Sequence, residues 1–173
     1  VTVTATVDVT SITMGAFTGT LDLNGQTINV GTFSLTGTGT RTLTMGSSAI
    51  NVSGTGTAWN AGTLTNCTIT ANTATITMSG SNATFLGATN WNGLSLVMNG
   101  SGSASLTAPF CTFANVTRTG TATKGDSLVI AAFTVTGTLT LNGDSASNRL
   151  FVTSNSLLGI ARTITNTGAT MSW

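Results

Sequence analysis

The side chains that could carry acid–base chemistry in this chain of 173 residues are few, because it contains no His, no Glu and no Tyr. Without His, neither a Ser-His-Asp nor a Cys-His catalytic centre can form within the chain. Glycoside hydrolysis needs two carboxyl groups about 5 to 10 Å apart. The only candidates are Asp8, Asp22, Asp126 and Asp144, and no pair of them is separated by a regular repeat length. We expect them to be solvated surface or turn residues, so the sequence predicts no enzyme, no cofactor and no metal site.

Two tryptophans occupy similar sequence contexts. Trp59-Asn-Ala-Gly-Thr-Leu64 resembles the later segment Trp91-Asn-Gly-Leu-Ser-Leu96. In one interpretation each indole covers an equivalent edge of the core. In the other, Trp59 and Trp91 are glycan-contact residues, because an indole offers a flat apolar face to a sugar ring.

The composition excludes several classes of protein. Five Lys and Arg against four Asp give a net charge of +1, which provides no electrostatic footprint for nucleic acid or an anionic membrane. No run of residues approaches the ~18 apolar residues of a membrane span. At 40% hydrophobic residues, the chain also differs from disordered sequences, which combine low hydrophobicity with high charge.

Threonine recurs at every second residue in several segments, among them 36–44 and 134–140, and residues 1–9 alternate in the same way. A period of two residues indicates β-strands. Helices are disfavoured, because Thr and Val are β-branched and Gly recurs throughout the chain. We therefore expect an all-β protein in which apolar side chains point inward and Thr points outward.

A strand-plus-turn phrase also recurs, and its spacing predicts the architecture. It is Leu21-Asp-Leu-Asn-Gly25, Leu43-Thr-Met-Gly, Ile76-Thr-Met-Ser-Gly80, Leu96-Val-Met-Asn-Gly100 and Leu139-Thr-Leu-Asn-Gly143. Most of its steps favour a parallel β-solenoid with coils of about 20–22 residues. The longer step from Leu43 to Ile76 indicates an enlarged coil or a misassigned phrase. About eight coils would form a rod roughly 40 Å long.

The turns of the phrase leave a structural alternative open. Asn tolerates a left-handed backbone and Gly adopts it freely, so Asn24-Gly25, Asn99-Gly100 and Asn142-Gly143 fit the corners of coils. Asn-Gly is also a two-residue hairpin signal. An antiparallel β-sandwich or a hairpin-built fibre is therefore the competing prediction.

The spacing of the two cysteines in the sequence matches two coils of a solenoid. Cys67 and Cys111 would then stack on one face about 9.6 Å apart, with Thr89 between them. That distance is too long for a disulfide. We expect two buried thiols that act as small hydrophobic groups.

Two stretches resemble known families. Thr138-Leu-Thr-Leu-Asn-Gly143 resembles the short strand repeat of autotransporter-type surface adhesins, without their Asn-Thr-Tyr continuation. The stretch Thr112-Phe-Ala-Asn-Val-Thr-Arg-Thr-Gly-Thr-Ala-Thr123, through Leu150-Phe-Val-Thr153, is similar to the Thr/Gly/Asn-rich repeats of bacteriophage tail-fibre, tailspike and capsid-fibre proteins. The second resemblance implies a structural virion or cell-surface module. It also implies a homo-oligomer with other subunits as partners, and a possible role in glycan attachment.

We expect residues 1–173 to form one repetitive β domain that is a segment of a longer chain. Because the end coils of a solenoid expose strand edges, this segment should associate when it is expressed alone. An ice-binding solenoid is one alternative, since Thr-x-Thr pairs would form a regular lattice on the rungs. A bacterial adhesin repeat and a polysaccharide depolymerase are the others.

Overall fold

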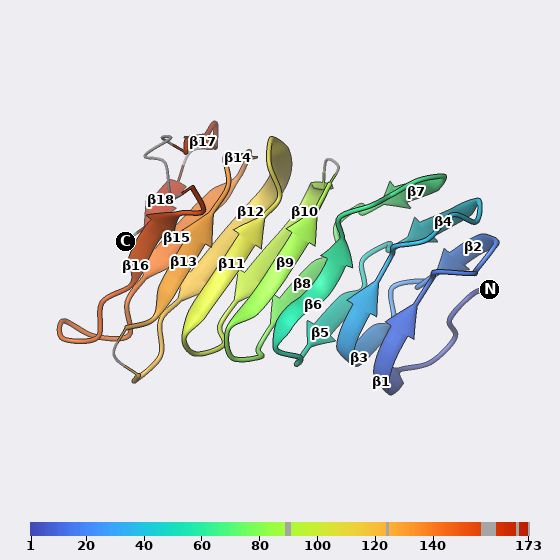
Figure 1. Ribbon diagram of the computed structural model, residues 1–173, viewed down its shortest axis with the longest axis horizontal. Helices are drawn as coiled ribbons and strands as arrows, with labels where there is room; N and C mark the ends of the chain where they lie inside the picture. The colour runs from blue at the N-terminus through green and yellow to red at the C-terminus, as the bar shows by residue number, and fades with distance from the viewer. Residues whose placement is uncertain (89–90, 124, 157–161, 169, 173) are drawn as a thin grey trace.

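The computed structural model describes residues 1–88, 91–123, 125–156, 162–168 and 170–172. Within these ranges every pairing between strands is parallel. The strands stack along one axis as a β-solenoid of about six turns, with the N-terminus at one end and the last strands at the other (Figure 1). The predicted parallel solenoid is confirmed. The antiparallel sandwich and the hairpin-built fibre are wrong.

The strands of successive turns line up on three faces. The first face contains β1 (Val7–Thr13), β3 (Thr27–Ser34), β5 (Ala49–Val52), β8 (Thr75–Met78), β10 (Trp91–Met98), β12 (Cys111–Thr119), β15 (Thr138–Asn142) and β18 (Thr170–Ser172). The second face contains the ends of β1 and β3, followed by β6 (Gly56–Ala61), β9 (Ala83–Gly87), β11 (Ser103–Thr107), β13 (Ser127–Ile130) and β16 (Phe151–Ser154).

The third face is divided between two sheets. Near the N-terminus, β2 (Gly19–Asp22), β4 (Arg41–Thr44) and β7 (Cys67–Thr70) form a separate three-stranded sheet (Figure 1). Further along the axis the third face consists of the first residues of β10 and β12, then β14 (Phe133–Val135) and β17 (Ile164–Asn166). Because β1, β3, β10 and β12 each continue around a corner, the other strands belong to one 15-stranded sheet.

Apolar side chains stack in register inside the solenoid. On the first face one buried column consists of Ile28, Ile50, Ile76, Leu96, Val116 and Leu139. The stretch of chain between successive members is shortest from Ile76 to Leu96 and from Leu96 to Val116, and it is longest from Ile50 to Ile76. Some coils are therefore longer than the sequence predicted, and the chain makes fewer turns than expected.

On this face threonines occupy outward positions between inward apolar residues, as the sequence predicted. Thr75 and Thr77 flank the buried Ile76, and Thr138 and Thr140 flank the buried Leu139 in the same way. All four are half-buried by their neighbours on adjacent rungs, whereas Ile76 and Leu139 are at most 2% exposed. The outward positions thus keep β propensity while presenting a hydroxyl and a methyl group to the surface.

A glycine stands at the corner between the first and second faces in turn after turn. A Cβ at Gly80 would lie 1.9 Å from the carbonyl oxygen of Gly54, and a Cβ at Gly100 would lie 2.0 Å from that of Gly80. Gly54 stands in the same relation to Gly31, at 2.3 Å. Consecutive corners are therefore packed backbone against backbone, and no side chain fits there.

This corner explains the recurring phrase and corrects part of its assignment. The copies that begin at Ile76, Leu96 and Leu139 all lie on the first face and end at the corner glycines. The copies at Leu21 and Leu43 pair with each other on the third face. The anomalous step from Leu43 to Ile76 therefore joins two different faces.

The turns that follow the phrase are also of two kinds. On the third face Asn24 and Gly25 both have positive φ, of 52° and 70°, as the sequence predicted for a coil corner. Asn99-Gly100 and Asn142-Gly143 have no positive φ. Those two glycines are required by the close approach of the backbone and not by a left-handed conformation.

We predict that Gly80→Ala destabilises the protein by about 1–3 kcal/mol or more, because the added methyl group collides with rigid backbone. Gly15→Ala is the matched control, since its Cβ would meet nothing closer than 3.4 Å and its φ is not positive. Urea unfolding monitored by circular dichroism measures both variants. Equal midpoints for the two would contradict the packed corner.

Candidate functional site

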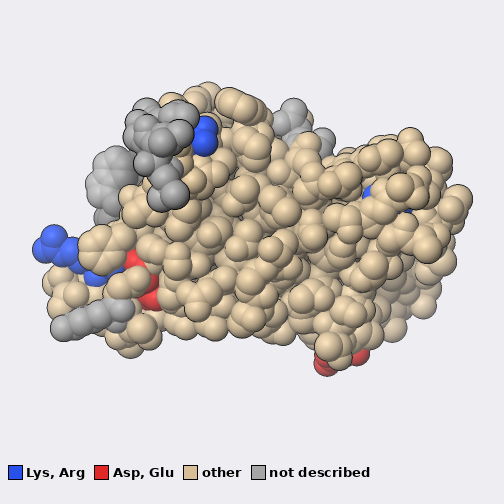
Figure 2. Space-filling view, in the orientation of Figure 1, with Lys and Arg blue, Asp and Glu red and all other residues tan. Residues whose placement is uncertain are grey.

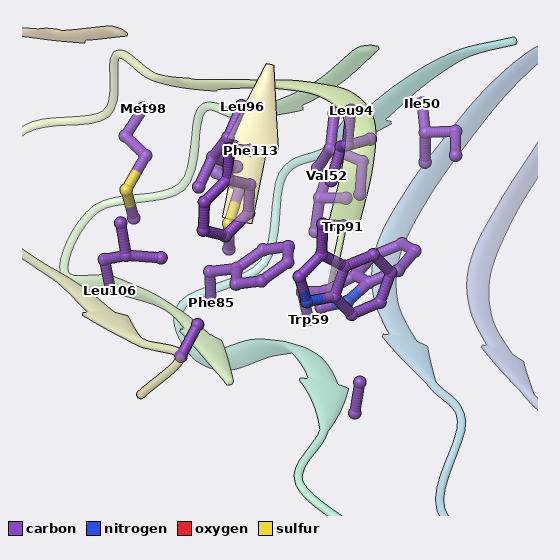
Figure 3. Close-up of a cluster of buried hydrophobic side chains, with 14 of the residues drawn as sticks. Ile50, Val52, Trp59, Phe85, Trp91, Leu94, Leu96, Met98, Leu106 and Phe113 are labelled. Carbon is purple, nitrogen blue, oxygen red and sulfur yellow. The ribbon is translucent and has the colours of Figure 1, made fainter. Parts of the chain in front are cut away.

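Trp59 and Trp91, the predicted glycan-contact residues, lie inside the solenoid. Both side chains are completely buried in a ladder of rings that crosses successive turns (Figure 3). Trp59 stacks on Phe85 with ring centroids 5.8 Å apart and planes inclined by 1°, and its centroid is 4.8 Å from that of Phe33. Trp91 meets both Trp59 and Phe85 edge to face, at 5.9 and 5.4 Å.

The ladder corrects the glycan-contact prediction for both residues. A ring that is 0% exposed cannot stack on a sugar, so Trp59 and Trp91 act as core residues. Within the described ranges neither indole Nε1 atom has a hydrogen-bond partner. Their burial is therefore supported by apolar and ring contacts, which for aromatic pairs contribute about 0.5–1.5 kcal/mol beyond area burial.

Three of the four carboxylates lie at the surface of the solenoid. Asp8 and Asp144 are exposed and Asp22 is half-buried, as expected for surface or turn residues. Asp22 lies on β2 near the N-terminal end of the solenoid, whereas Asp144 follows β15 near the other end. Across the described residues, no cluster of three or more Cys, Asp or similar ligands could hold a metal ion.

Asp126 is the exception, and the expectation that it would be solvated is wrong. It is only 1% exposed, directly precedes β13 and accepts hydrogen bonds from three groups. Its Oδ1 atom accepts a hydrogen bond from the Gly102 N–H, and its Oδ2 atom accepts from both the N–H and the hydroxyl of Thr121. Burial works to raise the pKa of this carboxyl group. The bonds from Thr121 and Gly102, together with the nearby Arg118, outweigh burial and hold the pKa below its usual value.

Arg118 points into the core on the other side of the same corner. Its side chain is 0% exposed and occupies an inward position of β12, two residues after the buried Val116. The guanidinium donates to the carbonyl oxygens of Met98, Gly100, Gly102, Thr119 and Ser127. Burial lowers the pKa of Arg118, and Asp126 opposes that shift. The pair joins the corners of consecutive turns from the inside.

Arg41 is a second buried cation, at the start of β4, where it is 1% exposed. Its guanidinium donates to the carbonyl oxygens of Leu35, Gly39 and Thr65. Sequence reasoning missed both arginines. A signal was available for Arg118, because Val116-Thr-Arg-Thr-Gly120 has the form of the repeated phrase with Arg at an apolar position.

The cysteines are only partly as predicted. They form no disulfide, and Cys111 is buried. Cys67 is half-buried, and burial raises the pKa of its thiol against the effect of Arg41. Cys67 begins β7 of the three-stranded sheet and Cys111 begins β12 of the larger sheet, so both lie on the third face but in different hydrogen-bonded sheets. Thr89, expected between them, lies outside the described residues.

The outer side of the three-stranded sheet presents a regular surface. In the parallel register of β2, β4 and β7, outward side chains form two columns, namely Thr20–Thr42–Thr68 and Asp22–Thr44–Thr70. Adjacent strands lie ~4.8 Å apart, and alternate residues along a strand lie ~6.7 Å apart. These six residues, which we call the threonine columns, form a small grid of hydroxyl and methyl groups with one carboxylate.

No protein-family model, curated protein sequence or solved structure matches this chain. Among the described residues, no helix is long and apolar enough to cross a lipid bilayer.

The Asp126 network predicts a specific dependence of stability on pH. Because the pKa of Asp126 is lowered in the folded state, its contribution is complete above the unfolded pKa of about 3.9 and is lost as the pH falls through the folded value. We expect Asp126→Asn to lower the free energy of unfolding at pH 7 by about 1.5–3 kcal/mol and to flatten its dependence on pH between pH 5 and pH 2.

Urea unfolding at a series of pH values measures this effect. Asp8→Asn is the matched control, since Asp8 is exposed on β1 and should leave both the stability and the slope unchanged. A variant at Asp126 that keeps the acid slope of the wild type would contradict the role assigned to this carboxylate.

Proposed function

We propose that this chain is a structural, non-catalytic module of a virion appendage or decoration, similar in role to a segment of a phage fibre. Its partners are then other virion or surface subunits, including copies of itself, and its location is the virion or the cell surface. The virion setting rests on the resemblance of residues 112–123 and 150–153 to phage fibre repeats. The structural role rests on the continuous core and on the parallel hydrogen bonding between successive turns.

The observation that carries the structural role is the uninterrupted core along the axis. Buried columns and the aromatic ladder run from turn to turn, and every rung is hydrogen-bonded to the next by parallel strands. Such a body bends little, because bending would separate packed side chains on one face and compress them on another. The surface is almost uncharged and rich in Thr, which suits a spacer that presents no reactive group.

A contribution to host-surface or glycan attachment belongs to this proposal, but it needs an aromatic residue other than the buried tryptophans. Phe110 is 81% exposed and has a φ of 60°, which is unusual for a bulky residue. It borders a cavity of about 310 Å³ that is also lined by Arg162, Thr134 and Thr163. An exposed ring next to a cation and hydroxyl groups is the arrangement that would contact a sugar.

The virion role predicts where the chain is found. Antibodies raised against the purified chain, applied to intact particles from its source and viewed by negative-stain microscopy, should label appendages or the outer capsid surface. The same antibodies pre-absorbed with the purified chain are the control. Labelling of cell interiors, with none on particles, would contradict the proposal.

Ice binding is a second candidate function, and the threonine columns are the observation that favours it. Two columns on a parallel sheet repeat at ~4.8 and ~6.7 Å, so that hydroxyl and methyl groups form a regular lattice. On the first face the equivalent outward column is less regular, because Ala49 and Asn115 interrupt Thr27, Thr75 and Thr138. The candidate ice-binding surface is therefore the three-stranded sheet.

If this surface binds ice, Thr42→Lys should abolish thermal hysteresis, because a long charged side chain at its centre disrupts the lattice. Thr140→Lys on the first face is the matched control and should leave hysteresis unchanged. Nanolitre osmometry of millimolar protein measures the effect. The absence of hysteresis in the wild type at that concentration would remove this candidate.

A further inference from the structure

Phe110 has a backbone conformation that is unfavourable for its side chain. It is the third residue of the turn formed by residues 108–111, in which the Cys111 N–H donates to the carbonyl oxygen of Ala108 at 3.2 Å. Pro109 stands at the second position, and Phe110 has a φ of 60°. This is the pattern of a type II turn, which favours Gly or Asn at its third position. A bulky side chain at that position strains the backbone.

An equivalent turn shows which residue type the fold accommodates more easily. Residues 64–67 precede the second residue of β7 as residues 108–111 precede that of β12, and the Cys67 N–H donates to the carbonyl oxygen of Leu64 at 3.1 Å. The third residue of this turn is Asn66, with a φ of 53°. A short polar side chain adopts the left-handed conformation more readily than a bulky one. The geometry of the corner therefore does not require Phe.

Packing does not compensate for this strain. The ring of Phe110 is 81% exposed, and it takes no part in the aromatic ladder, in which Phe85, Phe113 and Phe133 are buried. A strained backbone and an exposed apolar ring both act against folding. Such features are typical of binding sites, where a residue serves function at the expense of stability.

The cavity beside this ring lies on the side of the solenoid. The Phe110 N–H donates to the carbonyl oxygen of Ala132, and the Phe133 N–H donates to that of Thr163, so the cavity is lined from three successive rungs. Its volume of about 310 Å³ is at the lower end of the range of ligand pockets, which is about 300–1,000 Å³. A cavity of this size suits a single sugar ring.

Hydroxyl groups and one cation line the cavity. Thr134 and Thr165 are paired neighbours on β14 and β17, and Thr163 is exposed two residues before Thr165. Arg162 is half-buried, and its Nε atom donates to Oδ1 of Asn155 at 2.9 Å, which orients the guanidinium group. Among the described residues the two terminal nitrogen atoms of Arg162 have no hydrogen-bond partner.

The charge of the cavity favours an anionic ligand. None of the described residues that line it is acidic. Figure 2 shows that the visible surface carries few charged side chains, so a cation in a cavity is distinctive here. A guanidinium group binds a carboxylate through two parallel N–H donors. A carboxylate therefore suits the free side of Arg162.

We propose that this cavity binds an acidic sugar, that is, one ring of a glycan that carries a carboxylate. The apolar face of the sugar packs on the ring of Phe110, and its carboxylate accepts hydrogen bonds from Arg162. Its hydroxyl groups bind Thr134 and Thr163. This inference names the ligand class for the attachment role proposed above and rests on it. It also gives a reason for Phe at a position where the equivalent turn has Asn66.

Two ligands that differ only in the carboxylate test the class. Methyl β-glucuronide and methyl β-glucoside share one ring and differ in the group attached outside it. In an NMR titration at millimolar concentrations the glucuronide should bind at least tenfold more tightly, because only its carboxylate pairs with Arg162. The methyl glycoside of sialic acid is the second acidic probe, and its affinity relative to the glucuronide identifies the kind of acid.

Two variants separate the roles of the ring and the cation. Phe110→Asn should weaken binding of the acidic probe at least tenfold and raise the unfolding midpoint by about 2–4 °C, because the strain of the turn is relieved. Arg162→Gln should remove the preference for the glucuronide over the glucoside. Phe151→Asn is the matched control, since this ring is also exposed but has no positive φ, and it should alter neither binding nor the midpoint.

Several results would overturn the acidic-sugar site. They are the absence of binding by both acidic probes, equal binding of the glucoside and the glucuronide, and unchanged binding by Phe110→Asn. Self-association that Phe110→Asn abolishes, in a chain that binds no sugar, would make Phe110 a protein-contact residue instead. None of these results bears on the virion setting, which depends on the antibody labelling. Labelling that fails while the glucuronide binds would leave the sugar site and remove the virion setting.

Discussion

The close backbone approach at the corner glycines determines how each turn is placed on the previous one. Where Gly54, Gly80 and Gly100 follow one another, the carbonyl oxygen of one corner occupies the space in which the next residue would carry its Cβ. Two coils can approach this closely only if both bend at the same place. The strands before the corner then enter in the same register, so that apolar residues stack on apolar residues. The corner and the core columns are therefore two consequences of one geometric condition.

The core accommodates coils of unequal length because only the strands must remain in register. The step from Ile50 to Ile76 is longer than the step from Ile76 to Leu96, yet both pairs are aligned on the first face. One of the additional residues forms an irregularity within β6, between Gly56 and Trp59, after which the strands are again aligned. In the later turns Arg118 and Asp126 bind the backbone of the corners from within. At these corners, hydrogen bonds from Arg118 and to Asp126 therefore hold consecutive coils in register, as apolar packing does elsewhere.

Much of this architecture could be predicted from the sequence, because the alternation of Thr with apolar residues indicates which side chains point outward and which point into the core. A Thr between two apolar residues indicates an outward position whichever face it occupies. The phrase did not give the coil length correctly, because similar copies of it lie on different faces. The copy at Leu21 lies on the third face and the copy at Ile76 lies on the first. The first-face strands at Ile28, Ile50 and Val116 were not recognised as copies of the phrase, because their apolar or turn residues differ from it. The largest difference is Arg118, which stands at an apolar position. The phrase marks Arg118 as an inward position, but it does not show that carbonyl groups contributed by other coils will bind the buried guanidinium.

The functional residues were harder to predict, because type and spacing do not reveal exposure. The two tryptophans have similar sequence contexts but do not occupy equivalent positions, because Trp59 aligns with Phe33 and Phe85 on the second face whereas Trp91 aligns with Phe113 on the third. What distinguishes them is the position of the strand relative to its neighbours, which arises only when β6, β9 and the start of β10 are assembled. A solenoid also directs its sequence repeat to the interior and leaves a nearly uniform outer surface.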